Sequence, residues 1–211
     1  MKILNLYAGI GGNRKLWGDE HEITAVEYKP EIAAIYKDLY PNDTVLVEDA
    51  HEFLLEHFME YDFIWSSPPC QTHSKARFSA GVGSGQVKPK YPDMKLYQEI
   101  LLLSSESKVG RWAGRYCIEN VIGYYTPLIT PRSFARHYFW TNFFMPDFAY
   151  AEDTRGHSEN MAGISLKKGI DLSGYKHPDK HLLLRNCTEP ELGKHILDWA
   201  CQKYEPQQTL I

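Results

Sequence analysis

Short apolar runs that alternate with amphipathic segments constrain the fold of this chain most strongly. Each run is bounded by Gly, Pro or polar residues, which is typical of buried strands. Strands that alternate with helices form a parallel sheet covered on both faces. We therefore expect an α/β fold with a Rossmann-like, doubly wound, mostly parallel sheet. The predicted strands are Lys2–Tyr7, Ile23–Glu27, Thr44–Val47, Tyr61–Ser66, Arg115–Asn120 and His137–Phe143.

Apolar residues spaced three and four apart predict helices in three places. These segments are Ile32–Leu39, Leu96–Leu103 and Leu192–Ala200. Residues 146–185 contain several glycines and little periodicity, so we expect a small irregular subdomain there. The expected division is a main domain at 1–145, this subdomain, a closing segment and helix at 186–205 that pack back on the main domain, and a tail at 206–211.

Cysteine usage and hydropathy indicate a cytoplasmic protein without structural metal. Cys70, Cys117, Cys187 and Cys201 are far apart and form no C-x-x-C pair, which argues against a zinc site or a disulfide framework. No apolar run reaches the length of a membrane span, and the N-terminus does not read as a secretion signal.

The net charge of −4 argues at first against a polyanionic partner, but residues 71–95 carry five cations and one acid. That local excess is compatible either with a solvated loop or with a nucleic-acid contact.

Ligands of parallel sheets bind at the carboxyl ends of the strands. After the first predicted strand, Gly9, Gly11 and Gly12 lie in a turn where the backbone can approach a ligand closely. The spacing G-x-G-G differs from the dinucleotide pattern G-x-G-x-x-G. Glu27 ends the second strand, where an acid can bind ribose hydroxyls, and Tyr28 follows it. This pattern favours an adenosine moiety without settling which cofactor carries it.

Two further strand ends carry chemistry. Pro68 and Pro69 rigidify the backbone directly before Cys70, and a nucleophile needs such fixed geometry. The basic residues that follow are expected to favour the thiolate. Glu119 ends the adjacent strand, so its carboxylate is expected to face the same pocket as Cys70.

At this point a family resemblance becomes specific. The segments NLYAGIGG, VEYKPE, SSPPCQTHS and IENV, in this order, resemble the cytosine-C5 DNA methyltransferase family over Lys2–Phe143. Arg185–Pro190 resembles the last motif of that family. The resemblance implies a methyltransferase fold that binds S-adenosylmethionine. It also implies transfer of a methyl group to carbon 5 of cytosine in DNA, through base flipping and a covalent bond from Cys70 to carbon 6.

The same resemblance assigns roles to residues. Glu119 would contact ring N3 and the exocyclic amine of cytosine, and Arg136 would help to hold the base near Cys70. Residues 146–185 would be a short target-recognition region. The implied cofactor-binding residues are Tyr7, Ala8, Gly9, Gly11, Gly12, Glu27, Tyr28, Asp49, Ala50, Pro69, Asn186 and Thr188.

The expected partner is double-stranded DNA, bound by a monomer of prokaryotic or viral origin. Lys75–Lys95 would close over the flipped base. Candidate DNA contacts are Gln71, Ser74, Lys75, Arg77, Lys88, Lys90, Arg132, Arg155, Lys167 and Lys168, with Lys176 as a further possibility. The chain departs from the family at Phe134, where an arginine is usual, and at Ser67, where glycine is frequent. Because the recognition region is short, we expect a short or relaxed target site, or dependence on a partner.

Three alternatives stay open. A tRNA cytosine could replace the DNA substrate, and a catalytically idle homologue could bind cofactor or DNA alone. A dinucleotide oxidoreductase is disfavoured by the glycine spacing. The transferred group could also be bulkier than methyl.

Overall fold

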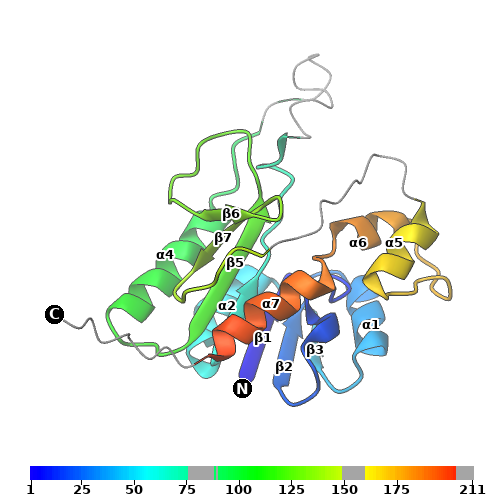
Figure 1. The fold of residues 1–211 in the computed structure, drawn as a ribbon, viewed down its shortest axis with the longest axis horizontal. Helices are drawn as coiled ribbons and strands as arrows, with labels where there is room; N and C mark the ends of the chain where they lie inside the picture. Colours follow the sequence, from blue (N-terminus) through cyan, green and yellow to red (C-terminus); the bar gives the residue numbers. More distant parts are fainter. Residues whose placement is uncertain (76–87, 89, 149–159, 203–211) are drawn as a thin grey trace.

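The computed structural model describes residues 1–75, 88, 90–148 and 160–202. Within these residues seven strands form one sheet in the order β3-β2-β1-β4-β5-β7-β6 (Figure 1). The pairs among β1 to β5 are parallel, whereas β7 runs antiparallel to both β5 and β6. The strands are β1 Lys2–Leu6, β2 Glu22–Val26, β3 Thr44–Leu46, β4 Phe63–Ser66, β5 Arg115–Val121, β6 Arg132–Phe134 and β7 His137–Thr141.

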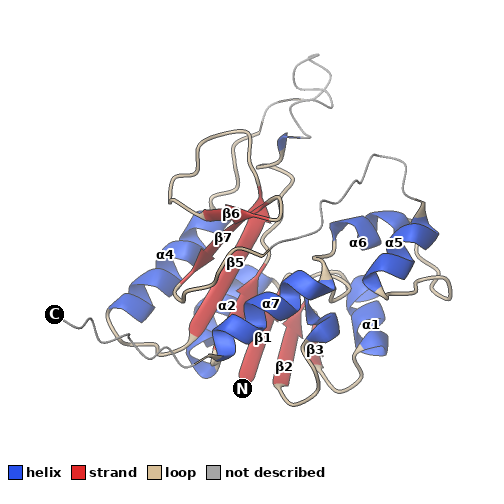
Figure 2. Cartoon of the chain, viewed as in Figure 1, coloured by secondary structure: helices blue, strands red, loops and turns tan. Residues whose placement is uncertain are grey.

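Helices cover both faces of the sheet (Figure 2). Because side chains alternate along a strand, Leu4 and Leu6 of β1 pack with α2 (Ala50–His57) and α4 (Lys95–Lys108). Ile3 points to the opposite face and packs with α7 (Pro190–Cys201). Helix α1 (Pro30–Leu39) lies on that second face, where Tyr36 packs against Ala25 of β2. The expected α/β class and mostly parallel sheet are therefore confirmed.

The predicted elements agree with the structure to within one or two residues at the strand ends, and the three predicted helices are present. Strand β6 and helix α2 were not predicted. The turn after β1 leads into a short 3-10 helix, η1 (Asn13–Leu16), and a second one, η2, covers Phe58–Glu60. None of the helices in the described ranges has the length and apolar character needed to cross a membrane.

The segment expected to be irregular contains two short helices, α5 (Met161–Lys168) and α6 (Lys180–Asn186). Their buried residues Ile164 and Leu184 pack with Ile32 and Ile35 of α1. Helices of seven or eight residues complete barely two turns, so their apolar spacing gives little periodic signal. This packing brings residues 161–186 beside the carboxyl end of β1 and places the segment after α6 next to the glycine turn (Figure 1).

Candidate active site

A cavity of about 340 Å³ lies at the carboxyl ends of β1, β2, β4 and β5. This volume is within the range of roughly 300–1,000 Å³ that small-molecule sites occupy. The lining comes from the glycine turn, the Pro-Pro-Cys segment after β4, the end of β5 and the segment after α6. The predicted site residues that line it together are Tyr7, Ala8, Gly9, Gly12, Glu27, Pro69, Cys70, Gln71, Glu119, Asn186 and Thr188.

The glycines of the turn have different physical roles. Gly9 has φ +55°, and a Cβ atom there would meet nothing within 4 Å. Gly11 has φ +73°, and a Cβ atom there would lie 2.4 Å from the ring of Tyr40. At Gly12 a Cβ atom would lie 2.3 Å from the carbonyl oxygen of Thr188. Gly9 thus faces the open cavity, Gly11 allows packing against α1, and Gly12 allows the segment after α6 to approach.

Glu27 has the geometry of a ribose-binding acid. One carboxylate oxygen accepts a hydrogen bond from the Gly9 N–H at 2.9 Å, and the other accepts one from the Lys29 N–H at 3.0 Å. The carboxylate is thereby fixed at the rim of the cavity beside the glycine turn. An acid held in this way can accept hydrogen bonds from a diol.

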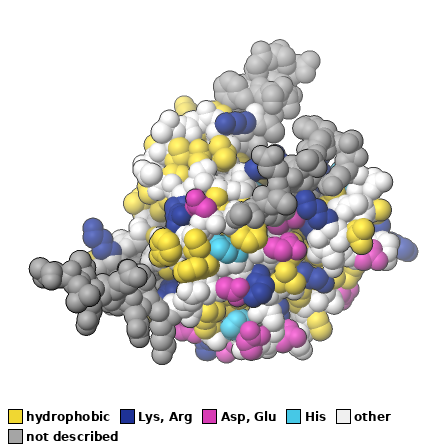
Figure 3. All heavy atoms as spheres, viewed as in Figure 1, with side chains coloured by type: hydrophobic (Ala, Val, Ile, Leu, Met, Phe, Trp, Pro, Cys, Tyr) yellow, Lys and Arg dark blue, Asp and Glu magenta, His cyan; other side chains and the backbone are white. Residues whose placement is uncertain are grey.

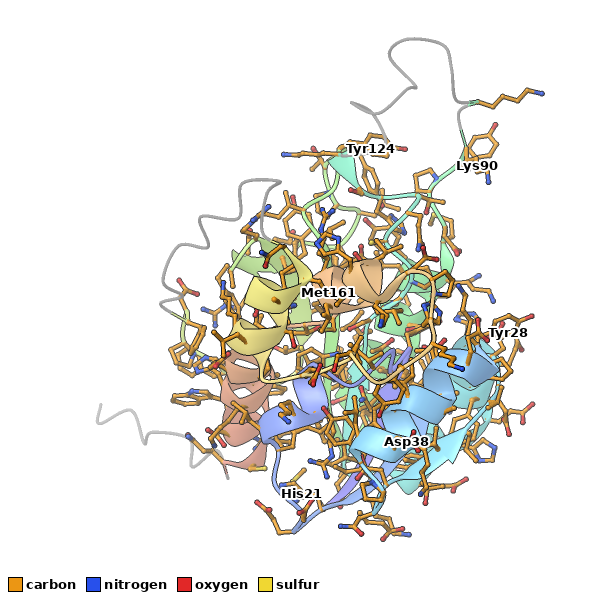
Figure 4. All side chains as sticks on the ribbon, turned by 90° about the vertical axis from the view of Figure 1, so that its right-hand side faces the viewer. His21, Tyr28, Asp38, Lys90, Tyr124 and Met161 are labelled. Carbon is orange, nitrogen blue, oxygen red and sulfur yellow. The ribbon has the colours of Figure 1, made fainter. Side chains whose placement is uncertain are left out.

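Four of the predicted cofactor residues do not line the cavity. Gly11 packs against α1, and Ala50, the first residue of α2, is buried in the core. Asp49 caps α2, where it accepts hydrogen bonds from the backbone N–H groups of residues 51 and 52. Tyr28 is 73% exposed and projects outward from the body (Figure 4). Their assignment as cofactor contacts stays a prediction.

A buried glutamate behind the cavity fixes the glycine turn. Glu99 of α4 is 1% exposed and accepts hydrogen bonds from the Tyr7 hydroxyl and the Ser66 hydroxyl, both at 2.6 Å. His51 Nδ1 lies 3.0 Å from the same carboxylate. Burial and Glu99 raise the pKa of Tyr7, so its hydroxyl stays a donor. Glu99 therefore joins the ends of β1 and β4 to α2, a role that no local sequence pattern predicted.

Hydrogen bonds to the carbonyl oxygens of Pro68 and Cys70 hold the Pro-Pro-Cys segment at its start and at its end. The Asn120 side-chain amide donates to the Pro68 carbonyl oxygen at 2.9 Å. The N–H groups of His73 and Ser74 donate to the Cys70 carbonyl oxygen at 3.0 and 2.9 Å. This supports the expectation of a rigid backbone around the cysteine.

The expected activation of the thiol is not found among the described residues. Burial and, second, the carboxylate of Glu119 raise the pKa of Cys70, so the thiol form is favoured instead of the thiolate. Arg77, one of the cations that we expected to act there, lies outside the described residues. Cys70 and Glu119 nevertheless line the same cavity, as predicted from their strand positions.

Glu119 is 8% exposed and has partners on both carboxylate oxygens. Its Oε2 atom accepts hydrogen bonds from Ser67 Oγ at 2.9 Å and from Thr188 Oγ1 at 3.2 Å. Trp65 Nε1 donates to Ser67 Oγ at 2.8 Å, which leaves the Ser67 hydroxyl hydrogen free for Glu119. The departure from glycine at Ser67 therefore adds a hydrogen bond to the site.

The β6–β7 hairpin places His137, and not Arg136, in the lining of the cavity. Ala135 and Arg136 form its tight turn with φ of 46° and 66°, and Arg136 is exposed and does not line the cavity. His137, the next residue, lines the cavity, and its Nε2 atom lies 3.5 Å from Glu119 Oε1. The role expected for Arg136 stays a prediction.

Only some of the residues expected to contact DNA are exposed among the described residues. Lys168 is 2% exposed, lies 3.3 Å from Glu189 and donates to the Cys187 carbonyl oxygen, so it is not available to DNA. Arg132 is tied to Asp147 at 2.7 Å. Arg155 lies, like Arg77, outside the described residues. Exposed positions are Gln71, Lys75, Lys88, Lys90, Lys167 and Lys176, whereas Ser74 is half-buried.

Lys90 and Tyr124 lie at the end of the molecule farthest from Asp38 and His21 (Figure 4). On the face seen in Figure 3, the described Lys and Arg side chains are interspersed with Asp and Glu.

Several lining residues were not predicted as site residues. Asn5 lies inside β1, and its side chain accepts a hydrogen bond from Asn13 Nδ2 at 2.8 Å. Asn5 and Asn120 lie within the segments that resemble the family, and His137 directly follows Arg136, so these positions carried a signal in the sequence. The unpredicted lining residues are Asn5, Ile10, Asn13, Trp65, Ser67, Pro68, Asn120, Val121, His137, Leu183, Arg185 and Cys187.

Solved structures with partial likeness include a mutant of DNMT2 from Spodoptera frugiperda, with 24% identity and a TM-score of 0.39 over 57% of this chain and 35% of that one. A SAM-dependent methyltransferase from Agrobacterium tumefaciens has 14% identity and a TM-score of 0.42 over 60% of this chain and 40% of that one. The chain thus spans well under half of either protein, and likenesses this weak carry no argument about activity.

No curated protein sequence matches the chain. Residues 1–91, which include the glycine turn, Glu27 and Cys70, match the family model of C-5 cytosine-specific DNA methylases. Over residues 1–91 the chain is therefore similar to the C-5 cytosine-specific DNA methylase family.

Proposed function

We propose that this protein transfers a methyl group from S-adenosylmethionine to carbon 5 of cytosine in DNA. One observation carries the proposal: Cys70, Glu119, Gly9 and Glu27 line a single cavity. A nucleophilic sulfur, a carboxyl group and an adenosine-type binding turn are the three parts that this reaction needs. The family match over residues 1–91 supports the same reaction class.

The residues present fit S-adenosylmethionine. The open space at Gly9 admits a ligand against the backbone, and Glu27 offers acceptors for ribose hydroxyls. Asn186 and Thr188 complete the lining from the segment after α6. When bound, S-adenosylmethionine supplies an electrophilic methyl group. The remaining chemistry belongs to the side chains of the chain.

Cys70 makes cytosine reactive at carbon 5. Its thiolate forms a bond to carbon 6, and the electron pair of the ring double bond moves toward carbon 5 and N3. N3 becomes more basic as this happens, and a proton on Glu119 stabilises it where the charge develops. After carbon 5 has taken the methyl group it loses its proton to water, which acts as the base in this step. The sulfur–carbon bond then breaks, and Cys70 leaves as thiolate.

The raised pKa of Cys70 couples these two residues. Because the negative charge of Glu119 is one of its causes, a proton on Glu119 removes part of the penalty against the thiolate. The sulfur is thus easier to ionise when the carboxyl group is ready to assist N3. The target base must leave the duplex to reach this buried pair, at a cost of about a few kcal/mol.

Methyl transfer into defined substrates tests the proposal. We expect label from S-adenosylmethionine to appear as 5-methylcytosine in duplex DNA, and nucleoside mass spectrometry identifies both the base and the group. Cys70→Ser should abolish transfer, while Cys201→Ser, at an exposed cysteine outside the cavity, should retain it. Incorporation into tRNA but not DNA would replace the proposed substrate. Unimpaired transfer by Cys70→Ser would refute the mechanism.

A further inference from the structure

His137 contacts the Glu119 carboxyl group at Oε1, whereas Ser67 and Thr188 donate to Oε2. It begins β7, opposite Val121 of β5, and its ring lies between the β6–β7 turn and the cavity. Nδ1 is 3.0 Å from the Ala135 carbonyl oxygen, and Nε2 is 3.5 Å from Glu119 Oε1. Each ring nitrogen therefore has one oxygen neighbour.

These two contacts restrict where protons can be. A carbonyl oxygen only accepts hydrogen bonds, so Nδ1 must carry a hydrogen to bond with Ala135. In a neutral ring Nε2 is then a bare acceptor that faces a carboxylate oxygen, and two acceptors repel one another. One further proton, either on Nε2 or on Glu119 Oε1, turns the repulsion into an attraction.

The other oxygen of Glu119 does not compete for that proton. Oε2 already accepts the hydroxyl hydrogens of Ser67 and Thr188. The other charged and titratable groups that line the same cavity are Tyr7, Glu27, Cys70, Arg185 and Cys187. Of the site's groups, only His137 is within ion-pair distance of Oε1 among the described residues.

We propose that His137 is a positioning residue that shares a proton with Glu119 Oε1 and so keeps Glu119 ready to protonate ring N3. The inference rests on the proposed function. As the sulfur of Cys70 bonds to carbon 6, the proton shared by Glu119 and His137 moves to N3, which leaves Glu119 as a carboxylate and Nε2 of His137 without a proton. When Cys70 leaves, N3 returns that proton to the pair, so the pair neither gains nor loses a proton over one turnover, and the proton from carbon 5 goes to water. The exposed neighbour Arg136 has a guanidinium that does not release a proton at neutral pH.

Nitrogen NMR of ¹⁵N-labelled histidine tests the proton arrangement without any activity. Signals of His137 are assigned by their loss in His137→Gln. We expect a protonated Nδ1, and an Nε2 signal at neutral pH that is shifted toward the protonated form. In Glu119→Gln, where an amide N–H can donate to Nε2, that signal should move to the position of a bare acceptor. A ring protonated only at Nε2, or the same Nε2 signal in both proteins, overturns the inference.

Kinetics test the consequence for the reaction. His137→Gln should lower kcat for methyl transfer by about 100-fold, in the range of general acid–base contributions, with KM for DNA and S-adenosylmethionine changed by less than about two-fold. His57→Gln is the matched control, because His57 also lies beside a carboxylate, 2.7 Å from Glu60, but does not line the cavity, and its kcat should be unchanged.

The outcomes separate the two proposals. If the native protein methylates no nucleic acid, the proposed function fails, and the NMR result alone decides whether His137 and Glu119 share a proton. If methylation occurs but His137→Gln retains kcat, or His57→Gln loses it to the same extent, the role of His137 is refuted while the proposed function stands.

Discussion

Replacing Gly9 by alanine adds a methyl group at the cavity, and the same change at Gly11 provides a matched comparison two residues away. Both glycines have positive φ, which costs a non-glycine residue roughly 1–2 kcal/mol. At Gly9 the new Cβ meets nothing within 4 Å, so this backbone term is the whole expected loss of folding free energy. Gly9→Ala should therefore lower the free energy of unfolding by about 1–2 kcal/mol.

At Gly11 a packing term adds to the backbone term. The Cβ atom would lie 2.4 Å from the Tyr40 ring and 2.7 Å from the Tyr36 ring. Neither ring can swing aside easily, because the Tyr40 hydroxyl donates to the Gly11 carbonyl oxygen and the Tyr36 hydroxyl to Asp43. Overpacking a core costs about 1–3 kcal/mol, so Gly11→Ala should lose roughly 2–5 kcal/mol in total.

The loss of affinity for S-adenosylmethionine should be larger in Gly9→Ala than in Gly11→Ala. The methyl group in Gly9→Ala occupies space that S-adenosylmethionine needs, and we expect its affinity to fall by at least about tenfold, or ~1.4 kcal/mol. Gly11→Ala, below its unfolding transition, should bind much closer to the native value. Urea unfolding followed by tryptophan fluorescence and titration calorimetry give the two quantities. If Gly9→Ala binds S-adenosylmethionine as the native protein does, or destabilises as much as Gly11→Ala, the assignment of these two glycines is wrong.

Two other predictions concern a buried ion pair and the buried thiol of Cys70. Asp43 pairs with Arg14 at 2.9 Å, both nearly inaccessible, so Asp43→Asn should cost about 3–5 kcal/mol in urea unfolding. Asp198→Asn breaks an exposed ion pair on α7 and should lower the free energy of unfolding by less than about 1 kcal/mol. If the two variants lose the same free energy of unfolding, burial does not set the contribution of the Asp43–Arg14 pair. Because burial and Glu119 raise the pKa of Cys70, its alkylation by iodoacetamide should be slow at neutral pH and accelerate as pH rises. Glu119→Gln removes one of these causes and should speed alkylation at a fixed pH, as measured by peptide mass spectrometry; no change would mean that the two groups do not interact.

The sequence allowed the sheet and the central pair to be predicted, because both follow from local patterns. Buried strands are short and apolar, and the carboxyl ends of neighbouring parallel strands meet at one edge. Cys70 and Glu119 each follow such a strand, so their shared cavity follows from position alone. The short helices α5 and α6 lacked enough turns for a periodic signal, and their positions depend on contacts with α1.

The structural surroundings of several predicted site residues did not follow from the sequence, because tertiary contacts determine them. Lys168 reads as a surface lysine, yet the fold buries it beside Glu189. Asp49 reads as a cofactor ligand, yet its carboxylate caps α2. The choice between Arg136 and His137 depends on the turn of a hairpin whose first strand has only three residues. Such contacts join residues that are far apart in sequence, so local sequence patterns do not predict them.

Covalent trapping on 5-fluorocytosine tests the central claim most directly, because fluorine at carbon 5 cannot leave as a proton does and elimination stalls. Duplex DNA containing this base is incubated with the protein and S-adenosylmethionine, and the denatured product is digested and mapped by mass spectrometry. We predict a methylated fluorocytosine bonded to the sulfur of Cys70, and no adduct with Cys70→Ala. A denaturant-resistant adduct that persists in Cys70→Ala, or one that maps to a different residue, would contradict the account.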